Sequence, residues 1–261
     1  MLTYLVFWVL FVLTGLVIMS NGPKQVQYLM PIICSWAPTF AFIMLFKRLY
    51  PNMTFGAYLK QQFSPVLNIP LIITIVAAQV LICFGIAFTY AIRNGMAVSA
   101  VLVTSSSALT LRFFDQMARG PLGEELGWRA YALNELQKRH SPLVSSVLLG
   151  VVWGLWHTPL WFISGYAGYD LVKYIMFFMV GIIATSIIIT AFYNLNKNLM
   201  IPIVIHLLFN FLASITQIDT LMNISYITLM YLVFALVLIV INPKKALYGA
   251  DYSKPSHQIA S

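Results

Sequence analysis

The chain has 261 residues, of which 61% are hydrophobic and only 8% are charged. Soluble globular proteins carry about 25% charged residues, so this composition excludes a soluble domain. The net charge of +8 does not indicate a nucleic-acid partner, because a basic excess in so apolar a chain is typical of membrane orientation. We therefore predict an integral, multi-pass membrane protein that is surrounded by the lipid bilayer and binds no nucleic acid.

A helix needs about 20 residues to cross the hydrocarbon layer of a bilayer, and charge-free runs of about this length follow one another along the chain. They predict an all-α fold, namely a polytopic membrane helix bundle with about eight transmembrane helices. The expected spans are 3–20, 27–46, 69–92, 95–113, 143–163, 173–194, 198–216 and 222–241.

Eight spans place both termini on the same side of the membrane, and the basic residues identify that side. With the N-terminus inside, twelve of the fifteen Lys and Arg residues lie in inner segments. Cytoplasmic loops carry an excess of Lys and Arg. We therefore expect the N- and C-termini to be cytoplasmic.

The segment 112–139 differs from the rest of the chain because it holds nine of the 22 charged residues, including all three glutamates. Pro121 suits a first helical turn, where its missing N–H costs nothing, and leucines then recur at roughly helical spacing. We predict an amphipathic helix over 121–139 that lies at or dips into the inner membrane face.

Two adjacent glutamates on this helix are not equivalent. Glu125 and Arg129 are four residues apart, with the acid on the N-terminal side, which is the favourable order for an ion pair. Glu124 is turned about 100° away and has Trp128 at the corresponding position. The spacing predicts one glutamate held by the arginine and one free for proton chemistry, although a solvated charged face would show the same pattern.

Two histidines lie within otherwise apolar spans, where an ionisable group is costly and generally faces a cavity or a partner. His157 shares a helix face with Trp153 and is followed by Pro159, which favours a local break in the helix. His206 shares a face with Asn210. Each histidine is a candidate functional residue, with a structural role as the alternative.

Three short motifs in this order resemble those of a known family: Glu124-Glu125-Leu126-Gly127-Trp128-Arg129, then Trp153-x-x-x-His157, then His206-x-x-x-Asn210. The family is CPBP, the CAAX protease and bacteriocin-processing or Abi-type family of intramembrane endopeptidases. Its pattern is EExxxR, FxxxH and HxxxN or HxxxD on an eight-helix membrane core. Trp153 stands where the family usually has Phe, and this keeps an aromatic wall.

The resemblance implies an endopeptidase of the type II CAAX protease class that cuts a peptide bond near the inner membrane face. Glu124 would be the general base that activates a water, and His157 would help to hold that water. His206 and Asn210 would stabilise the oxyanion. The implied partner is a peptide or a membrane-associated protein, and the expected location is a bacterial cell membrane.

Supporting roles follow from the same resemblance: Glu125 and Arg129 would fix the geometry of the helix, and Trp153 would form the aromatic wall. No further cofactor-binding residues are expected, and the oligomeric state is left open.

A metal cofactor is left open by the sequence, since Glu124, His157 and His206 form a plausible zinc set of the metalloprotease type. A glutamate-dependent mechanism without metal uses the same residues. We favour the metal-free form, because neither histidine has a carboxylate partner within its own span to orient a ligand nitrogen.

We expect one transmembrane domain over 1–245, with a catalytic core at about 112–216, and a short cytoplasmic tail over 246–261. The alternative to a protease is a membrane immunity or scaffold protein of the same fold without essential proteolysis. A small transporter is a third hypothesis, but the charged residues gather on one helix and no matching pair of broken helices is seen.

Overall fold

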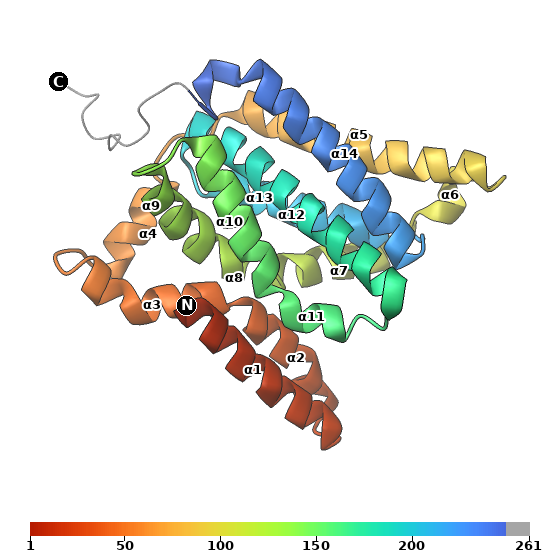
Figure 1. Ribbon diagram of the computed structural model, residues 1–261, viewed down its shortest axis with the longest axis horizontal. Coiled ribbons are helices and arrows are strands. Elements are labelled where there is room, and N and C mark those ends of the chain that lie inside the picture. Colours follow the sequence, from red (N-terminus) through yellow and green to blue (C-terminus); the bar gives the residue numbers. More distant parts are fainter. Residues whose placement is uncertain (249–261) are drawn as a thin grey trace.

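The computed structural model describes residues 1–248, which form a bundle of helices joined by short loops (Figure 1). The helices are α1 (Leu2–Met19), α2 (Lys24–Ser35), α3 (Ala37–Leu49), α4 (Phe55–Phe63), α5 (Ile69–Arg93), α6 (Val98–Val101), α7 (Ser106–Ala118), α8 (Pro121–Glu125), the π-helix η1 (Leu126–Leu133), α9 (Asn134–Gln137), α10 (Pro142–Trp156), α11 (Thr158–Phe162), α12 (Gly168–Asn196), α13 (Met200–Ile215), α14 (Thr220–Ile241) and the 3₁₀ turn η2 (Pro243–Lys245). Within 1–248 the only β-type pairing is an isolated bridge between Leu102 and Thr216. The predicted all-α bundle is confirmed.

Four helices of the described chain are long and apolar enough to cross a membrane: α1, α5, α12 and α14. The pair α2–α3 adds a fifth candidate, bent by 54° where the two helices meet at Trp36. Two shorter apolar helices, α10 and α13, accompany them. These helices confirm a polytopic membrane bundle, whereas the predicted number of eight spans is not confirmed.

Three of the expected spans are interrupted. The span expected over 27–46 bends at Trp36, between α2 and α3. The span expected over 143–163 breaks at His157 into α10 and α11, beside Pro159 as the sequence indicated. The span expected over 95–113 is not one helix, because the chain leaves α6 in extended conformation at Leu102 and begins α7 only after Ser105. The Val103 N–H donates to the Ile215 carbonyl here, which satisfies the backbone without a helix.

Helix α12 lies at the centre of the bundle, between α10 and α14. Small residues allow this close packing, as is usual for membrane helices. A Cβ atom added at Gly150 of α10 would lie 2.9 Å from the Ile183 Cα, and one added at Gly181 would lie 2.7 Å from the Thr228 Oγ1 of α14. Buried hydroxyls on α12 remain paired, as where Ser186 donates to the Ser146 carbonyl at 2.8 Å.

The segment α8–η1, which carries the three charged residues of the EExxxR motif, is enclosed by the bundle. Every residue of 123–130 is buried, so this part of the expected amphipathic helix has no solvated face. Two glycines permit the close approach of α3: an added Cβ would lie 2.5 Å from the Trp36 Cδ1 at Gly123 and 2.6 Å from the Pro38 carbonyl oxygen at Gly127. A π-helix in place of regular α-helix is often found at functional sites.

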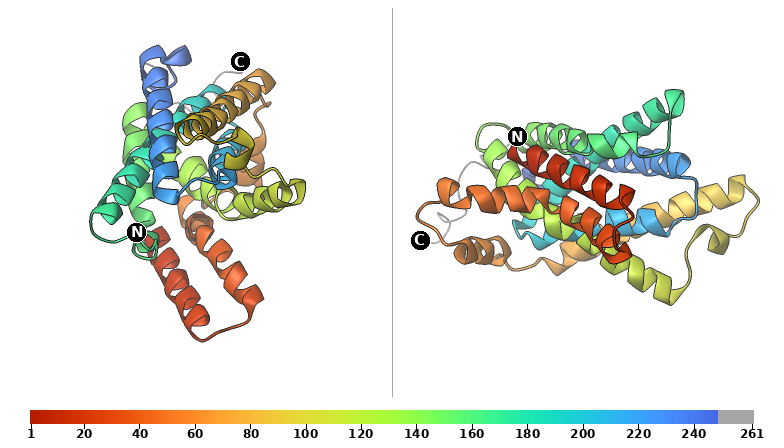
Figure 2. Two further views of the ribbon diagram at one scale, coloured as in Figure 1. Left: turned by 90° about the vertical axis from the view of Figure 1, so that its right-hand side faces the viewer. Right: turned by 90° about the horizontal axis from the view of Figure 1, so that it is seen from below.

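The two ends of the described chain differ in their packing. The α1–α2 hairpin projects from the bundle on the side opposite to α5 and α14, as three views agree (Figures 1 and 2). The last described residues, by contrast, pack inward: Ala246 and Leu247 are buried, and the Ala246 carbonyl accepts a hydrogen bond from Asn194 at 2.9 Å. The rest of the expected tail 246–261 lies outside the described residues.

Candidate active site

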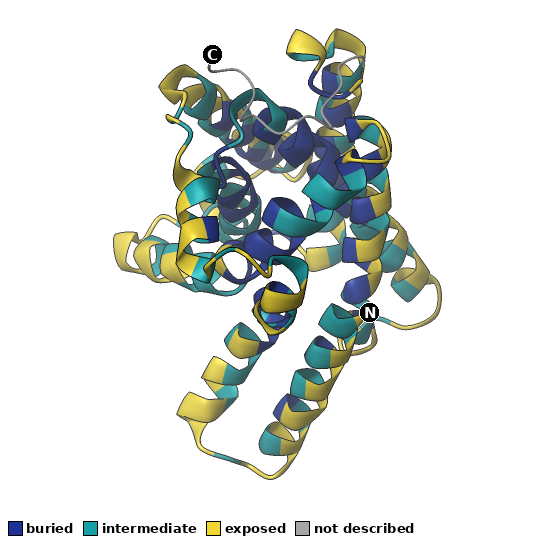
Figure 3. Cartoon of the chain, turned by 90° about the vertical axis from the view of Figure 1, so that its left-hand side faces the viewer, coloured by how far each residue is buried: buried dark blue, intermediate teal, exposed yellow. Residues whose placement is uncertain are grey.

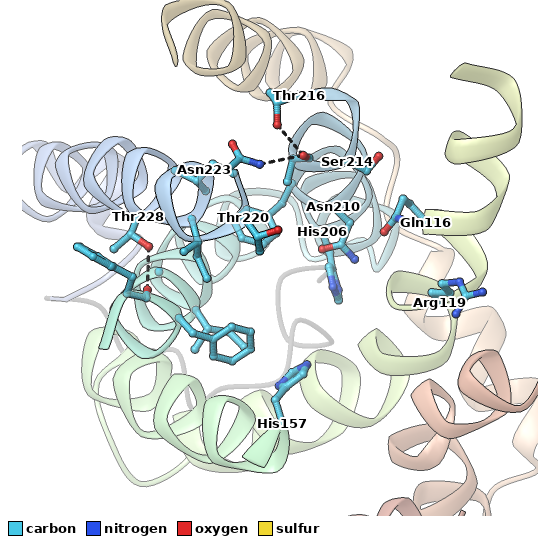
Figure 4. A pocket seen from close by; sticks show the side chains of 18 of the residues that line it. Gln116, Arg119, His157, His206, Asn210, Ser214, Thr216, Thr220, Asn223 and Thr228 are labelled. Atoms are coloured by element: carbon cyan, nitrogen blue, oxygen red, sulfur yellow. Dashed lines mark hydrogen bonds between the residues drawn. The ribbon is translucent and has the colours of Figure 1, made fainter. Parts of the chain in front are cut away.

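A cavity of about 520 Å³ opens between α7, α12, α13 and α14, and polar groups gather at its inner end. The four side chains predicted as catalytic, Glu124, His157, His206 and Asn210, all line it. They come from α8, the α10–α11 break and α13, segments that are far apart in the sequence. Figure 4 shows His157, His206 and Asn210 of this set. The fold therefore brings the three motifs to one place.

Glu125 holds two other members of the site. Its Oε1 atom accepts a hydrogen bond from Arg129 Nη1 at 2.9 Å, which is the ion pair expected from the helical spacing. The same oxygen lies 2.6 Å from His206 Nδ1. Glu125 and Arg129 are fully buried, so each charge depends on the other. The link between Glu125 and His206 fixes which ring nitrogen of the histidine, Nε2, is left for the cavity.

Glu124 is bonded to a different helix. Its Oε2 atom accepts a hydrogen bond from Trp153 Nε1 at 2.7 Å. The sequence analysis expected Glu124 to be free, and the structure shows that it is not. Glu124 lies on α8, outside the candidate spans, and the residue is 3% exposed where it lines the cavity. Burial raises the pKa of Glu124 to about 7, against the lowering effects of His206 and the Trp153 hydrogen bond. A carboxyl group with a pKa near neutral is suited to proton transfer.

Trp153 contacts Arg129, His157 and His206 in addition to Glu124, so it does more than form an aromatic wall. Its ring lies under the guanidinium of Arg129, with Cζ 4.0 Å from the ring centroid. Its carbonyl oxygen is 2.8 Å from His157 Nδ1, and its ring meets that of His206 edge-on at 5.1 Å between centroids. Trp153 therefore helps to orient both histidines, and it contacts Glu124 and Arg129 of the EExxxR motif.

Gly120 is a site residue that the sequence analysis missed. A Cβ atom at this position would lie 2.8 Å from Asn210 Nδ2 and 3.0 Å from His206 Nε2. Both nitrogens are thus close to the backbone of Gly120, at the junction of α7 and α8. The signal in the sequence was the pair Gly120-Pro121, which marks a chain break before a helix.

The proposed zinc set does not form a ready metal site. Within 1–248, no three His, Cys, Asp or Glu side chains are grouped so that they could hold a metal ion. The Nδ1 atoms of His157 and His206 are both engaged, with a carbonyl and a carboxylate respectively. The carboxylate partner of His206 comes from α8, not from its own span, so the reason given for favouring a metal-free mechanism does not apply to this histidine.

The fold and this cavity define a polytopic helical membrane protein with a buried carboxylate–histidine site. A family model described as type II CAAX prenyl endopeptidase Rce1-like matches residues 106–212. CAAX prenyl protease 2 of Methanococcus maripaludis is 39% identical over 102 residues, which cover 36% of this chain and 38% of the relative. With the three motifs, these matches confirm the resemblance to the CPBP family over about two fifths of the chain.

Proposed function

We propose that this protein is a glutamate-dependent endopeptidase of the type II CAAX protease class, embedded in the membrane. The observation that carries the proposal is the common cavity of Glu124, His157, His206 and Asn210. A base, a water-binding group and two nitrogen donors around one point are the parts that hydrolysis of a peptide bond requires.

Glu124 acts as the base in this mechanism. It takes a proton from a water that His157 Nε2 holds, and the oxygen of that water attacks the scissile carbonyl carbon. Glu124 then gives the proton to the leaving nitrogen as the C–N bond breaks. A positioned base contributes on the order of 10²–10⁴ in rate.

His206 and Asn210 stabilise the negative oxygen that develops on the attacked carbonyl. In its doubly protonated form, His206 donates through Nδ1 to Glu125 and through Nε2 to the oxyanion, and the Glu125 carboxylate stabilises that cation. The Asn210 amide supplies the second donor, since its Nδ2 lies beside His206 Nε2 at Gly120. Removal of one such donor costs about 10²–10³ in kcat.

The substrate is a peptide or a membrane-associated protein, cut near the inner membrane face with both termini of the enzyme in the cytoplasm. The similarity to CAAX prenyl protease 2 of Methanococcus maripaludis supports a CAAX-type substrate, and the positive-inside distribution of Lys and Arg supports the orientation. We further propose that the protein resides in a bacterial cell membrane.

The test uses the purified full chain in vesicles with peptides that end in a CAAX-type sequence, with and without a prenyl group. Cleavage by the wild-type protein and none by Glu124→Gln is the expected result. Exhaustive chelation leaves the activity intact if no metal takes part. Loss of activity on chelation, restored by Zn²⁺, would replace the metal-free mechanism, and no cleavage of any peptide would overturn the function.

A further inference from the structure

Arg119 occupies a position that the mechanism above does not use. It follows α7, immediately before Gly120, and lines the cavity of about 520 Å³ (Figure 4). It also lines a second cavity of about 560 Å³, which lies between α1, α2 and the α10–α11 break. Glu124 and His157 are shared by both cavities as well. The two cavities thus meet at the candidate active site, with Arg119 beside it.

Arg119 is the sole lysine or arginine among the described residues that line either cavity. Apart from Glu124, the other lining side chains are neutral or are histidines. A single fixed cation in such surroundings acts strongly on an anion, because a protein interior screens charge less than water does.

The guanidinium of Arg119 contacts two neighbouring side chains, those of Asp115 and Tyr28. Its Nε donates to Asp115 Oδ1 at 2.6 Å, and its Cζ lies 5.0 Å from the ring centroid of Tyr28. The Tyr28 hydroxyl donates to the same Asp115 oxygen at 2.9 Å. The terminal nitrogens Nη1 and Nη2 have no hydrogen bond to any residue of 1–248, and the side chain is 29% exposed. Asp115 and Tyr28 therefore orient a fork of donors that lacks an acceptor.

We propose that Arg119 binds a carboxylate of the peptide substrate, located within a few residues of the scissile bond. This inference rests on the proposed function. Arginine presents its terminal N–H groups in a planar fork that matches a carboxylate. An extended peptide advances about 3.3–3.6 Å per residue, and Arg119 adjoins Gly120, where the two oxyanion donors lie. A carboxylate at the fork is thus close in sequence to the bond that is cut.

Such a carboxylate has two chemical sources: the free C-terminus of a substrate, or an acidic side chain. In the first case the enzyme trims chain ends, because only a bond near the C-terminus places the terminal carboxylate at Arg119. Hydrogen bonds to charged groups contribute about 1.5–3 kcal/mol, which corresponds to a preference of about 10- to 100-fold.

The experiment compares three peptides of one sequence: a free C-terminal acid, a C-terminal amide, and an amide whose last residue is replaced by Glu. We expect the wild-type protein to cleave the free acid with a kcat/KM about 10- to 100-fold above that of the amide. Arg119→Gln should reduce this ratio to about 1. If the Glu-containing amide is cleaved with the same kcat/KM as the free acid, Arg119 binds a carboxylate from either source. If only the free acid is favoured, the terminal carboxylate is the ligand.

Two controls separate carboxylate binding from a structural role of Arg119. Asp115→Asn breaks the ion pair but leaves the arginine, so the acid-to-amide ratio should persist. Arg119→Lys keeps the charge without the fork and should give an intermediate ratio. The inference is overturned if the acid-to-amide ratio of kcat/KM is unchanged in Arg119→Gln, or if it is about 1 in the wild-type protein. Either result leaves the protease assignment intact.

Binding provides a measurement that does not depend on cleavage. The affinities of the acid and amide peptides are measured by fluorescence anisotropy with the Glu124→Gln protein and with Glu124→Gln/Arg119→Gln. A preference for the acid that disappears in the double variant supports carboxylate recognition even if the wild-type protein cleaves none of the peptides. Equal affinities in Glu124→Gln contradict it.

Discussion

Helices α1, in the α1–α2 hairpin, and α12, at the centre of the bundle, have nearly the same mean hydropathy but differ sharply in burial. In the most apolar window of each helix, 11% of the residues of α1 are buried, against 61% in α12 (Figure 3). The difference lies in the small and hydroxyl residues. Helix α12 has Gly181, Thr185 and Ser186 at its contacts with neighbouring helices, whereas eight of the 18 residues of α1 are large hydrophobic side chains that are exposed.

This contrast shows what hydropathy can and cannot reveal in a membrane protein. Both helices are apolar enough to span a bilayer, because lipid and protein interior are equally apolar surroundings. Close packing and polar pairing distinguish the core. The family match agrees with this division, since it covers residues 106–212 and thus excludes the hairpin.

The largest expected effect in the core comes from the two glutamates. Glu124→Gln should abolish proteolysis while the protein still folds and inserts, because the change is nearly isosteric and removes only the base. Glu125→Gln should lower the amount of folded protein as well as activity, because it leaves the buried Arg129 charge without its partner. Cleavage rate and the yield of monodisperse protein in detergent are measured for both. Equal yields and equal residual activities would contradict the division of roles.

Gly120→Ala should cost about 10²–10³ in kcat, the amount associated with a lost oxyanion donor. The new methyl group would fall 2.8 Å from Asn210 Nδ2 and 3.0 Å from His206 Nε2, so at least one donor must move. Gly56→Ala is the matched control, because nothing lies within 4 Å of a Cβ at that position. A kcat for Gly120→Ala equal to that of the control would show that these nitrogens do not act on the reacting carbonyl.

The sequence predicted those parts of the site that depend on local geometry. The ion pair of Glu125 and Arg129 follows from four-residue spacing on one helix, and the break at His157 follows from Pro159. The bond between Glu125 and His206 joins residues 81 positions apart, and no local pattern specifies such a contact. Gly120 and Arg119 were missed for the same reason, since their importance arises from what the fold places beside them.

Trp153→Phe should lower kcat about 10-fold with little change in KM. The substitution retains an aromatic ring under Arg129 but removes the N–H that donates to Glu124 at 2.7 Å, and a hydrogen bond to a charged group contributes about 1.5–3 kcal/mol. Trp156→Phe is a suitable control, because Trp156 Nε1 is buried without a hydrogen-bond partner among the described residues. Trp153→Phe should therefore lower turnover while Trp156→Phe leaves it unchanged, and a change in KM alone would exclude the positioning role.

The smallest effect is expected in the hairpin, and a pair of leucines tests it. Leu16 on α1 is 57% exposed, whereas Leu149 on α10 is 1% exposed. Leu149→Ala opens a cavity in the core and should cost about 2–5 kcal/mol of stability, while Leu16→Ala removes a side chain that faces the surroundings and should change stability by less than about 0.5 kcal/mol. Melting of both variants is followed in the same detergent, with cleavage of a peptide as a second readout. Phe7 packs against Trp156, with the tilted rings 4.3 Å apart between centroids, and anchors the hairpin to the bundle, so only substitutions beyond this contact should leave stability unchanged. If Leu16→Ala destabilised the protein as much as Leu149→Ala, the exposed face of α1 would be packed against another protein surface and not against lipid.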